Sequence, residues 1–171
     1  MNPGASPIVA AVQMNSGADL AANLAAAGHL LADAARRGAV LAVLPENFAF
    51  MGARDTDKLA HAESPGQGPI QEFLADTSRN LKLAIVAGTM PMAVPGRPEK
   101  VFAASLVYDA AGNCEARYDK IHLFDVEVQR EGKSESYRES ASIEYGEPRL
   151  IAAETPAGIA GLTVCSDLRF P

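Results

Sequence analysis

Short apolar runs alternate with amphipathic stretches along the first half of the chain. Residues 8–13, 40–44 and 83–88 are apolar, bounded by turn-forming residues, and short enough to be buried strands. Between them, residues 19–37 and 69–81 repeat apolar side chains at helical spacing along one face. The order strand, helix, strand, helix, strand predicts an α/β architecture with helices covering a sheet.

After residue 100 the pattern changes from alternating strands and helices to hairpins. Strand-like runs flank clusters of turn-forming residues, which is typical of antiparallel pairs. The predicted strands are 101–108 with 115–118, and 149–153 with 159–164. The polar and charged segment from about 126 to 142 is predicted to be a long loop. The sheet is therefore expected to be mixed, within a single domain over residues 1–171.

Composition narrows the classes of partner. The chain carries 15 Lys and Arg against 21 Asp and Glu, a formal net charge of −6, and no clustered basic run. This argues against a nucleic-acid or anionic-membrane partner. The N-terminus lacks the positive charges of a secretory signal, and no apolar run approaches the roughly 18 residues of a membrane span. Its 2 cysteines are too few for a disulfide framework, so a cytoplasmic location is expected.

Cys165 is a candidate nucleophile because of its place at the end of the apolar run 159–164. A thiol between a strand and a helix start lies where backbone N–H groups converge, and these favour a thiolate and can hold an oxyanion. The alternative is a small buried apolar residue, as most free cysteines are. A redox pair with Cys114 is a weaker interpretation, because the two cysteines form no C-x-x-C motif.

Glu46 and Lys120 also stand at strand ends. A carboxylate at the carboxyl edge of an α/β sheet can act as a general base, and an inward lysine needs a negative partner. Each residue alone could equally be a solvated surface charge. His122 is interpreted as a hydrogen-bonded structural histidine, and no zinc-ligand spacing is present, so no metal and no cofactor are expected. A thiol beside a carboxylate and a lysine could open an amide or nitrile without a metal.

Three segments carry a resemblance to a known family. They are LPENF at 44–48, YDKIHLFD at 118–125 and VCSDLRFP at 164–171. In this order, and over essentially the whole chain, they resemble the nitrilase superfamily of carbon–nitrogen hydrolases. The resemblance implies a four-layer α-β-β-α sandwich with mixed sheets, and a homo-oligomer in the complete protein. It also implies that this chain is the N-terminal portion of the domain, because the family's domain continues well beyond the cysteine.

The resemblance implies a catalytic triad of Glu46, Lys120 and Cys165. Glu46 would accept the thiol proton, and Cys165 would attack the amide carbon to form a thioester. Lys120 and the backbone N–H of Ser166 would stabilise the oxyanion. Glu139 resembles the second glutamate of many members, which helps to hold the lysine and position the substrate. The alternative for Glu139 is a charged residue in a polar loop.

Residues 124–127 and 138–140 are similar to the Nit branch of the family, which includes deaminated-glutathione amidases and ω-amidases. This similarity implies a small-molecule substrate, the amide of a small dicarboxylic or peptide-like acid. Ser166 stands where this branch more often has a tyrosine, which implies a different pocket wall. An anionic substrate would want cations at the pocket mouth. The candidates are Arg130, Lys133, Arg138 and Arg169.

Two other functions stay open from the sequence. Nitrilase or carbamoylase chemistry could use the same triad on a different substrate. Alternatively, the chain could be a non-catalytic fragment or interaction module that keeps the motifs without a working site, because missing helices would leave an apolar sheet face exposed. Dependence of amide hydrolysis on Cys165 separates the enzyme from the module.

Overall fold

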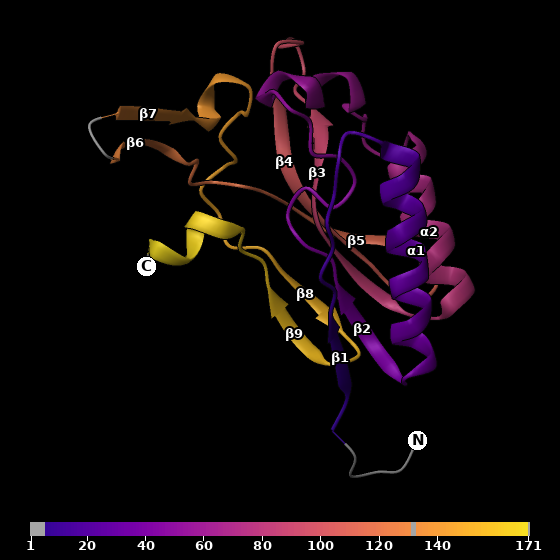
Figure 1. The fold of residues 1–171 in the computed structure, drawn as a ribbon. Helices are drawn as coiled ribbons and strands as arrows, with labels where there is room; N and C mark the ends of the chain where they lie inside the picture. The colour runs from indigo at the N-terminus through magenta and orange to yellow at the C-terminus, as the bar shows by residue number, and fades with distance from the viewer. Residues whose placement is uncertain (1–5, 131–132, 171) are drawn as a thin grey trace.

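The computed structural model describes residues 6–130 and 133–170, without the side chains of 129, 130 and 133–135. A five-stranded sheet with the order β1-β2-β3-β4-β5 forms its centre (Figure 1). β1, β2 and β3 pair in parallel, whereas β3, β4 and β5 pair antiparallel. The mixed sheet predicted from the sequence is therefore confirmed. The strands are β1 (Ile8–Ala11), β2 (Ala39–Val43), β3 (Ala84–Ala93), β4 (Val101–Tyr108) and β5 (Cys114–Asp119).

Two helices cover one face of this sheet (Figure 1). They are α1 (Leu20–Arg36) and α2 (Pro69–Leu81). The Asp19 side chain caps α1 by accepting a hydrogen bond from the backbone N–H of Ala22 at 3.0 Å. At the start of α2, the buried carboxylate of Glu63 accepts the backbone N–H groups of Ile70 and Gln71 at 2.6 and 3.1 Å. Both helix starts thus satisfy backbone donors that would otherwise have no partner.

Apolar side chains fill both faces of the sheet. The core under the helices includes Leu31, Leu44, Phe48, Ile70, Leu74, Ile85, Met90 and Leu106. The opposite face carries a second cluster, which includes Leu41, Val86, Val107, Tyr118, Leu162 and Val164. Two short antiparallel strands, β8 (Ala152–Thr155) and β9 (Gly158–Gly161), lie on this side (Figure 1). The described residues therefore form helix, sheet and hairpin layers, consistent with the α-β-β part of the expected sandwich.

The segment predicted as a long loop at 126–142 is a hairpin, so that prediction was wrong. β6 (Asp125–Arg130) and β7 (Lys133–Arg138) pair antiparallel as a separate two-stranded sheet that extends from the body (Figure 1). Val126 is partly covered, but Val128 and Tyr137 are exposed. A ribbon without a buried face can be polar throughout, and its composition then looks like that of a loop.

Other boundaries also shift. β3 runs on past residue 88 to Ala93 through an irregularity in its pairing with β4. The second predicted hairpin forms, but its strands are the shorter β8 and β9. The helix expected after Cys165 is a short 3₁₀ helix at Cys165–Arg169. The polar segment before α2 contains another 3₁₀ helix at Asp55–His61. Over the described residues, no helix is long and apolar enough to cross a bilayer.

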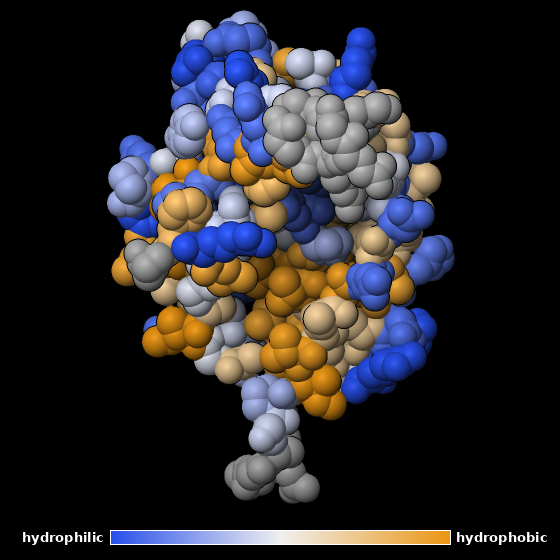
Figure 2. Space-filling model, turned by 60° about the vertical axis from the view of Figure 1, so that its left-hand side comes forward, coloured by the Kyte–Doolittle hydropathy of each residue, from blue (hydrophilic) through white to orange (hydrophobic). Residues whose placement is uncertain are grey.

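Several large apolar side chains remain on the surface. Figure 2 shows apolar side chains gathered on one face of the molecule, which is hollowed near its centre. The more exposed ones in the described chain are Ile8, Met51, Leu150, Ile159, Leu168 and Phe170. Contiguous exposed apolar surface is unusual on a monomeric protein and marks a region where another polypeptide can pack.

Candidate active site

Glu46 lies in a tight turn directly after β2, and this turn is held against β3. The backbone N–H of Asn47, which has a left-handed φ of 56°, donates to the buried hydroxyl of Thr89 at 2.8 Å. Gly88 permits the close approach of the two segments, because a Cβ at this position would lie 1.9 Å from the carbonyl oxygen of Pro45. Gly88 and Thr89 of β3 therefore fix the position of the turn that carries Glu46.

Gly88→Ala is expected to destabilise the fold by about 3 kcal/mol, because the added methyl group must displace the Pro45 backbone. It should also lower the rate of any reaction that uses Glu46 by about 100-fold, through misplacement of this carboxylate. Urea unfolding and kcat measure the two effects. Gly17→Ala is the matched control, since a Cβ there meets nothing within 4 Å. Equal stability of the two variants would contradict the close approach.

Lys120 follows β5 and is 1% exposed, so its ammonium group is buried. Its Nζ donates to Glu46 Oε1 at 3.0 Å and to Glu139 Oε1 and Oε2 at 3.0 and 2.9 Å. Burial alone would lower the pKa of Lys120, but the hydrogen bonds and charges of Glu139 and Glu46 outweigh burial and raise it. The lysine is therefore held as a cation between two carboxylates that come from distant parts of the chain.

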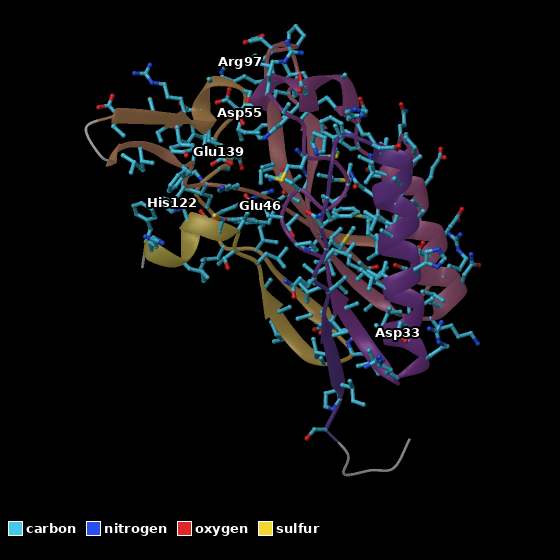
Figure 3. All side chains as sticks on the ribbon, viewed as in Figure 1. Asp33, Glu46, Asp55, Arg97, His122 and Glu139 are labelled. Atoms are coloured by element: carbon cyan, nitrogen blue, oxygen red, sulfur yellow. The ribbon has the colours of Figure 1, made fainter. Side chains whose placement is uncertain are left out.

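Glu139 follows β7 directly and is itself fixed by the backbone. Its Oε2 accepts the N–H of Phe124 at 2.7 Å, and Ser140 N–H donates to the Asp125 carboxylate at 3.0 Å. The base of the β6–β7 hairpin thus orients this carboxylate toward Lys120. Figure 3 shows Glu46 and Glu139 reaching the same region from different segments of the chain.

Cys165 begins the 3₁₀ helix after the apolar segment that follows β9, and its thiol is exposed. Its φ of 50° is a left-handed conformation, which is uncommon for a residue with a side chain and marks a sharp turn. Burial and the negative charge of Glu46 raise the pKa of the Cys165 thiol, although Lys120 and the backbone N–H of Ser166 pull it down. The resting group is therefore a thiol that needs a base to become a nucleophile.

Glu46, Lys120, Glu139 and Cys165 all line one cavity of about 220 Å³. The sequence-predicted residues that should act together are thus brought to one place. The remaining lining residues are Asn47, Asp55, Lys58, Phe124, Tyr137 and Arg138. The size suits a small organic molecule, and the walls offer both charges and aromatic surface.

The structure places the other predicted binding residues differently. Ser166 is buried, and its hydroxyl donates to the carbonyl oxygen of His122 instead of lining the cavity; only its backbone N–H faces the thiol. Among the predicted cations, Arg138 lines the cavity and Arg169 does not. The side chains of Arg130 and Lys133 lie outside the described part of the structure.

Lys58 is a cavity residue that sequence reasoning missed. It belongs to the 3₁₀ helix Asp55–His61 and is half-buried. No carboxylate in the described part of the chain forms an ion pair with it. Little in the sequence indicated this position, because a lysine in a polar segment is usually an exposed, solvated side chain.

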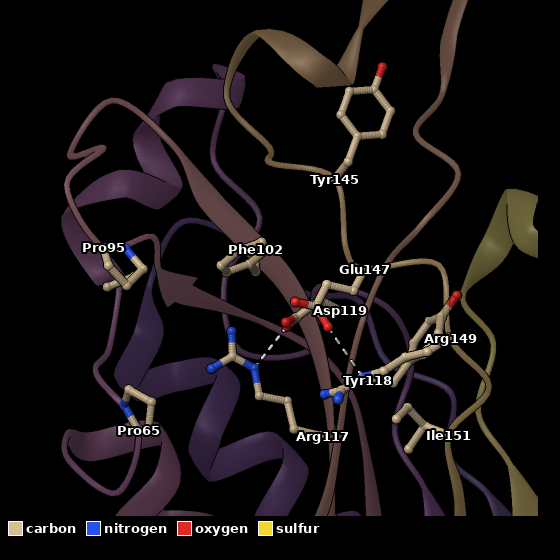
Figure 4. Close-up of a pocket in the computed structure, with 11 residues that line it drawn as sticks. Pro65, Pro95, Phe102, Arg117, Tyr118, Asp119, Tyr145, Glu147, Arg149 and Ile151 are labelled. Atoms are coloured by element: carbon tan, nitrogen blue, oxygen red, sulfur yellow. Dashed lines mark hydrogen bonds and ion pairs between the residues drawn. The ribbon is translucent and has the colours of Figure 1, made fainter.

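A larger cavity of about 440 Å³ lies elsewhere, between β5 and the segment before β8 (Figure 4). Its charges are balanced: Arg117 pairs with Asp119 at 2.8 Å, and Arg149 lies near Glu147. Arg117 also lies over the ring of Phe102, at 5.3 Å from its centre. This cavity contains none of the candidate catalytic side chains, so size alone does not identify the reactive site.

Over the described residues, no three His, Cys, Asp or Glu side chains are grouped so that they could hold a metal ion. Cys114 and Cys165 are both free. The His122 ring lies against Asp167 and stacks on Phe170, as a structural histidine would.

Comparison with known proteins identifies the family. Residues 8–171 match the Carbon-nitrogen hydrolase family, and the chain belongs to it. A curated relative, the deaminated glutathione amidase of Yersinia enterocolitica, is 38% identical over 95% of this chain and 55% of its own length. The chain thus spans about half the length of this relative.

Solved structures agree with the fold. The NitFhit protein of C. elegans superposes with a TM-score of 0.84 at 28% identity, over 95% of this chain and 39% of that one. Nit3 of Saccharomyces cerevisiae, a member of branch 10 of the nitrilase superfamily, superposes with a TM-score of 0.78 at 27% identity, over 95% of this chain and 56% of that one. The predicted nitrilase-like architecture is confirmed.

Proposed function

We propose that the protein hydrolyses the carboxamide C–N bond of a small carboxylic acid, with Cys165 as nucleophile, Glu46 as general base and Lys120 as oxyanion donor. The observation that carries this proposal is the buried Lys120 ammonium between Glu46 and Glu139, in the same cavity as Cys165. Membership of the carbon–nitrogen hydrolase family supports the reaction class. The chemistry needs a base, a nucleophile and a fixed positive charge, and these side chains supply them.

In the acylation step, Glu46 accepts the thiol proton while Sγ of Cys165 attacks the carbonyl carbon. The raised pKa of the thiol makes this base necessary, because little thiolate exists without it. The negative charge that develops on the carbonyl oxygen is stabilised by the Lys120 ammonium and the Ser166 backbone N–H. The C–N bond then breaks, ammonia leaves with the proton held by Glu46, and a thioester remains on Cys165.

In the deacylation step, water attacks the thioester carbon. Glu46 accepts a proton from this water, Lys120 stabilises the oxyanion again, and the C–S bond breaks. The acid is released, and the sulfur regains its proton from Glu46. Glu139 keeps Lys120 charged and aligned through both steps, because its two oxygens lie 3.0 and 2.9 Å from Nζ.

Lys58 and Arg138 favour an anionic substrate. Both line the cavity, and the charge of Lys120 is already balanced by Glu46 and Glu139, so these two cations are available to a carboxylate on the substrate. Asp55, which also lines the cavity, and Asp125, whose pKa the charge of Arg138 lowers, oppose this preference in part. An amide of a dicarboxylic or peptide-like acid therefore fits, as does the name of the Yersinia relative, deaminated glutathione amidase.

Lys58→Met tests this charge preference. It is expected to raise the KM for glutaramate about tenfold, the effect of losing a charge-assisted hydrogen bond, while the KM for uncharged pentanamide stays the same. Ammonia release measures both substrates. Lys82→Met, an exposed lysine outside the cavity, serves as the control. An equal rise in KM for both amides would mean that Lys58 affects the shape of the pocket but does not bind the substrate carboxylate.

Two alternatives can be separated from amide hydrolysis. Nitrile or carbamoyl chemistry would use the same thiol, so turnover of glutaronitrile or an N-carbamoyl amino acid in place of glutaramate would favour it. A non-catalytic interaction module would show no thiol-dependent turnover of any of these compounds. The cavity with its converging charges favours an enzyme over the module.

A cytoplasmic location and self-assembly belong to the same proposal. Both cysteines are free, which suits a reducing compartment. The exposed apolar side chains Leu150, Ile159 and Leu168 support packing against further polypeptide, as in a homo-oligomer.

A further inference from the structure

Asp167 is a buried carboxylate, 5% exposed, that the proposed chemistry does not use. Its Oδ2 accepts the hydroxyl of Tyr118 at 2.6 Å and the backbone N–H of Val164 at 2.9 Å. Its Oδ1 accepts the backbone N–H of His122 at 2.8 Å and lies 2.8 Å from Nδ1 of the same residue. A buried anion is costly unless donors surround it, and here both oxygens are fully engaged.

The hydrogen-bond partners of Asp167 are close in sequence to two candidate catalytic residues, Cys165 and Lys120. Val164 directly precedes Cys165, while Tyr118 and His122 flank Lys120 at two residues on each side. The Asp167 carboxylate therefore connects the backbone just before Cys165 to residues on both sides of Lys120. Ser166 adds a second link, because its hydroxyl donates to the His122 carbonyl.

The Cys165 turn needs such support. A left-handed φ is unfavourable for a residue with a side chain, so neighbouring contacts must hold it. Asp167 closes the turn twice, since its backbone N–H donates to the Val164 carbonyl at 3.0 Å and its side chain accepts the Val164 N–H. Without the carboxylate, the turn loses its anchor to the segment that carries Lys120.

The charge state of Asp167 suits this role. Burial alone would raise its pKa, but hydrogen bonds from Tyr118, His122 and Val164 outweigh burial and lower it. The group is thus an anion at neutral pH, and an ionised carboxylate can only accept hydrogen bonds. The His122 Nδ1 facing it therefore carries a proton.

We propose that Asp167 is a positioning residue that fixes the sulfur of Cys165 relative to the ammonium of Lys120, by holding Val164 on one side and Tyr118 and His122 on the other. This inference rests on the proposed function for its catalytic consequence, but the geometry it describes can be tested through the thiol alone.

Asp167→Asn is the sharpest test because it keeps the shape of the side chain. Each oxygen of Asp167 accepts a backbone N–H, so either orientation of the asparagine amide sets its NH₂ group against a donor. The turn is expected to relax, and kcat for glutaramate should fall about 100-fold with a change in KM below about threefold. Tyr118→Phe removes one hydrogen bond only and should give a smaller loss of kcat in the same direction.

The pH dependence of alkylation of Cys165 by iodoacetamide, measured under conditions where circular dichroism shows each variant to be folded, gives a readout of the thiol's surroundings that is separate from global stability. In the native protein, burial and Glu46 hold the pKa of this thiol above its usual range. When the turn loosens, the midpoint of alkylation should move down toward that of a free cysteine in Asp167→Asn, and by less in Tyr118→Phe. The Cys114→Ser background keeps the second exposed cysteine from contributing.

Asp76→Asn is the matched control, because it makes the same chemical change at an exposed residue of α2. Its kcat and alkylation midpoint should equal those of the native protein. A folded Asp167→Asn protein with native kcat and a native midpoint would overturn the positioning role, as would a native midpoint in Tyr118→Phe if Asp167→Asn does not fold. A shifted midpoint in a protein that hydrolyses no amide would instead preserve the positioning role and reject the proposed function.

Discussion

Cys165→Ala is expected to lower kcat for amide hydrolysis by at least about 10⁴-fold, because no other group can form the thioester. The fold should be unaffected, since the thiol is exposed and alanine keeps the backbone connection. Ammonia release from glutaramate measures the loss. A mass increase on the native protein, trapped by acid quenching during turnover and absent in the variant, would place the acyl group on this sulfur.

Cys114→Ala provides the control for Cys165→Ala. Cys114 is also free and exposed, but it begins β5 and does not line the reactive cavity. Its removal should leave kcat unchanged. Substantial turnover by the Cys165→Ala protein would eliminate the thioester mechanism, whatever the position of the other side chains.

Lys120→Met should have the second largest effect, on both activity and stability. Methionine matches the volume of lysine but leaves the Glu46 and Glu139 carboxylates facing each other without the cation between them. Removing one partner from a buried ionic cluster costs about 3–5 kcal/mol. Loss of the oxyanion donor should lower kcat by about 10³-fold. Urea unfolding and kcat per folded molecule separate the two effects.

Lys100→Met is the matched control for Lys120→Met, since Lys100 is also largely covered and lies 3.7 Å from Glu144, outside the reactive cavity. It should cost about 1 kcal/mol or less and leave kcat unchanged. Native kcat in the Lys120→Met protein would contradict the role of the ammonium. Because Glu139 and Glu46 raise the pKa of Lys120, its contribution to stability is fully present below the ordinary value of 10.5 while these two carboxylates are ionised, and it is lost as the pH rises above that value through the raised pKa.

The central sheet and its helices could be predicted from the sequence because their burial is one-sided or complete. α1 and α2 repeat apolar residues on one face, and β2 and β3 are short apolar runs, so periodicity reports their environment directly. The β6–β7 hairpin gives no such signal, because its exposed Val128 and Tyr137 alternate with polar residues on a ribbon outside the core. Composition there resembles that of a loop.

The candidate site was only partly predictable. Their position at strand ends made Cys165, Glu46 and Lys120 candidates. That they lie in one cavity depends on contacts between segments up to 119 residues apart, which the spacing of residues does not encode. Only the family resemblance predicted that they act together. Asp167 looked like an ordinary polar residue after a strand, and its role depends on Tyr118 and His122 arriving from another segment. Long-range partners of this kind are set by packing, which a single sequence does not display.

The β6–β7 hairpin is clasped at its base, where Glu139 accepts the Phe124 N–H and Asp125 accepts the Ser140 N–H. Tyr137 and Arg138, just before this clasp, line the reactive cavity, whereas the rest of the hairpin extends away from the body. One wall of the cavity, Tyr137 and Arg138, is therefore tied to the same hairpin base that presents Glu139 to Lys120, so a substitution there is expected to alter the wall and the ion pair together.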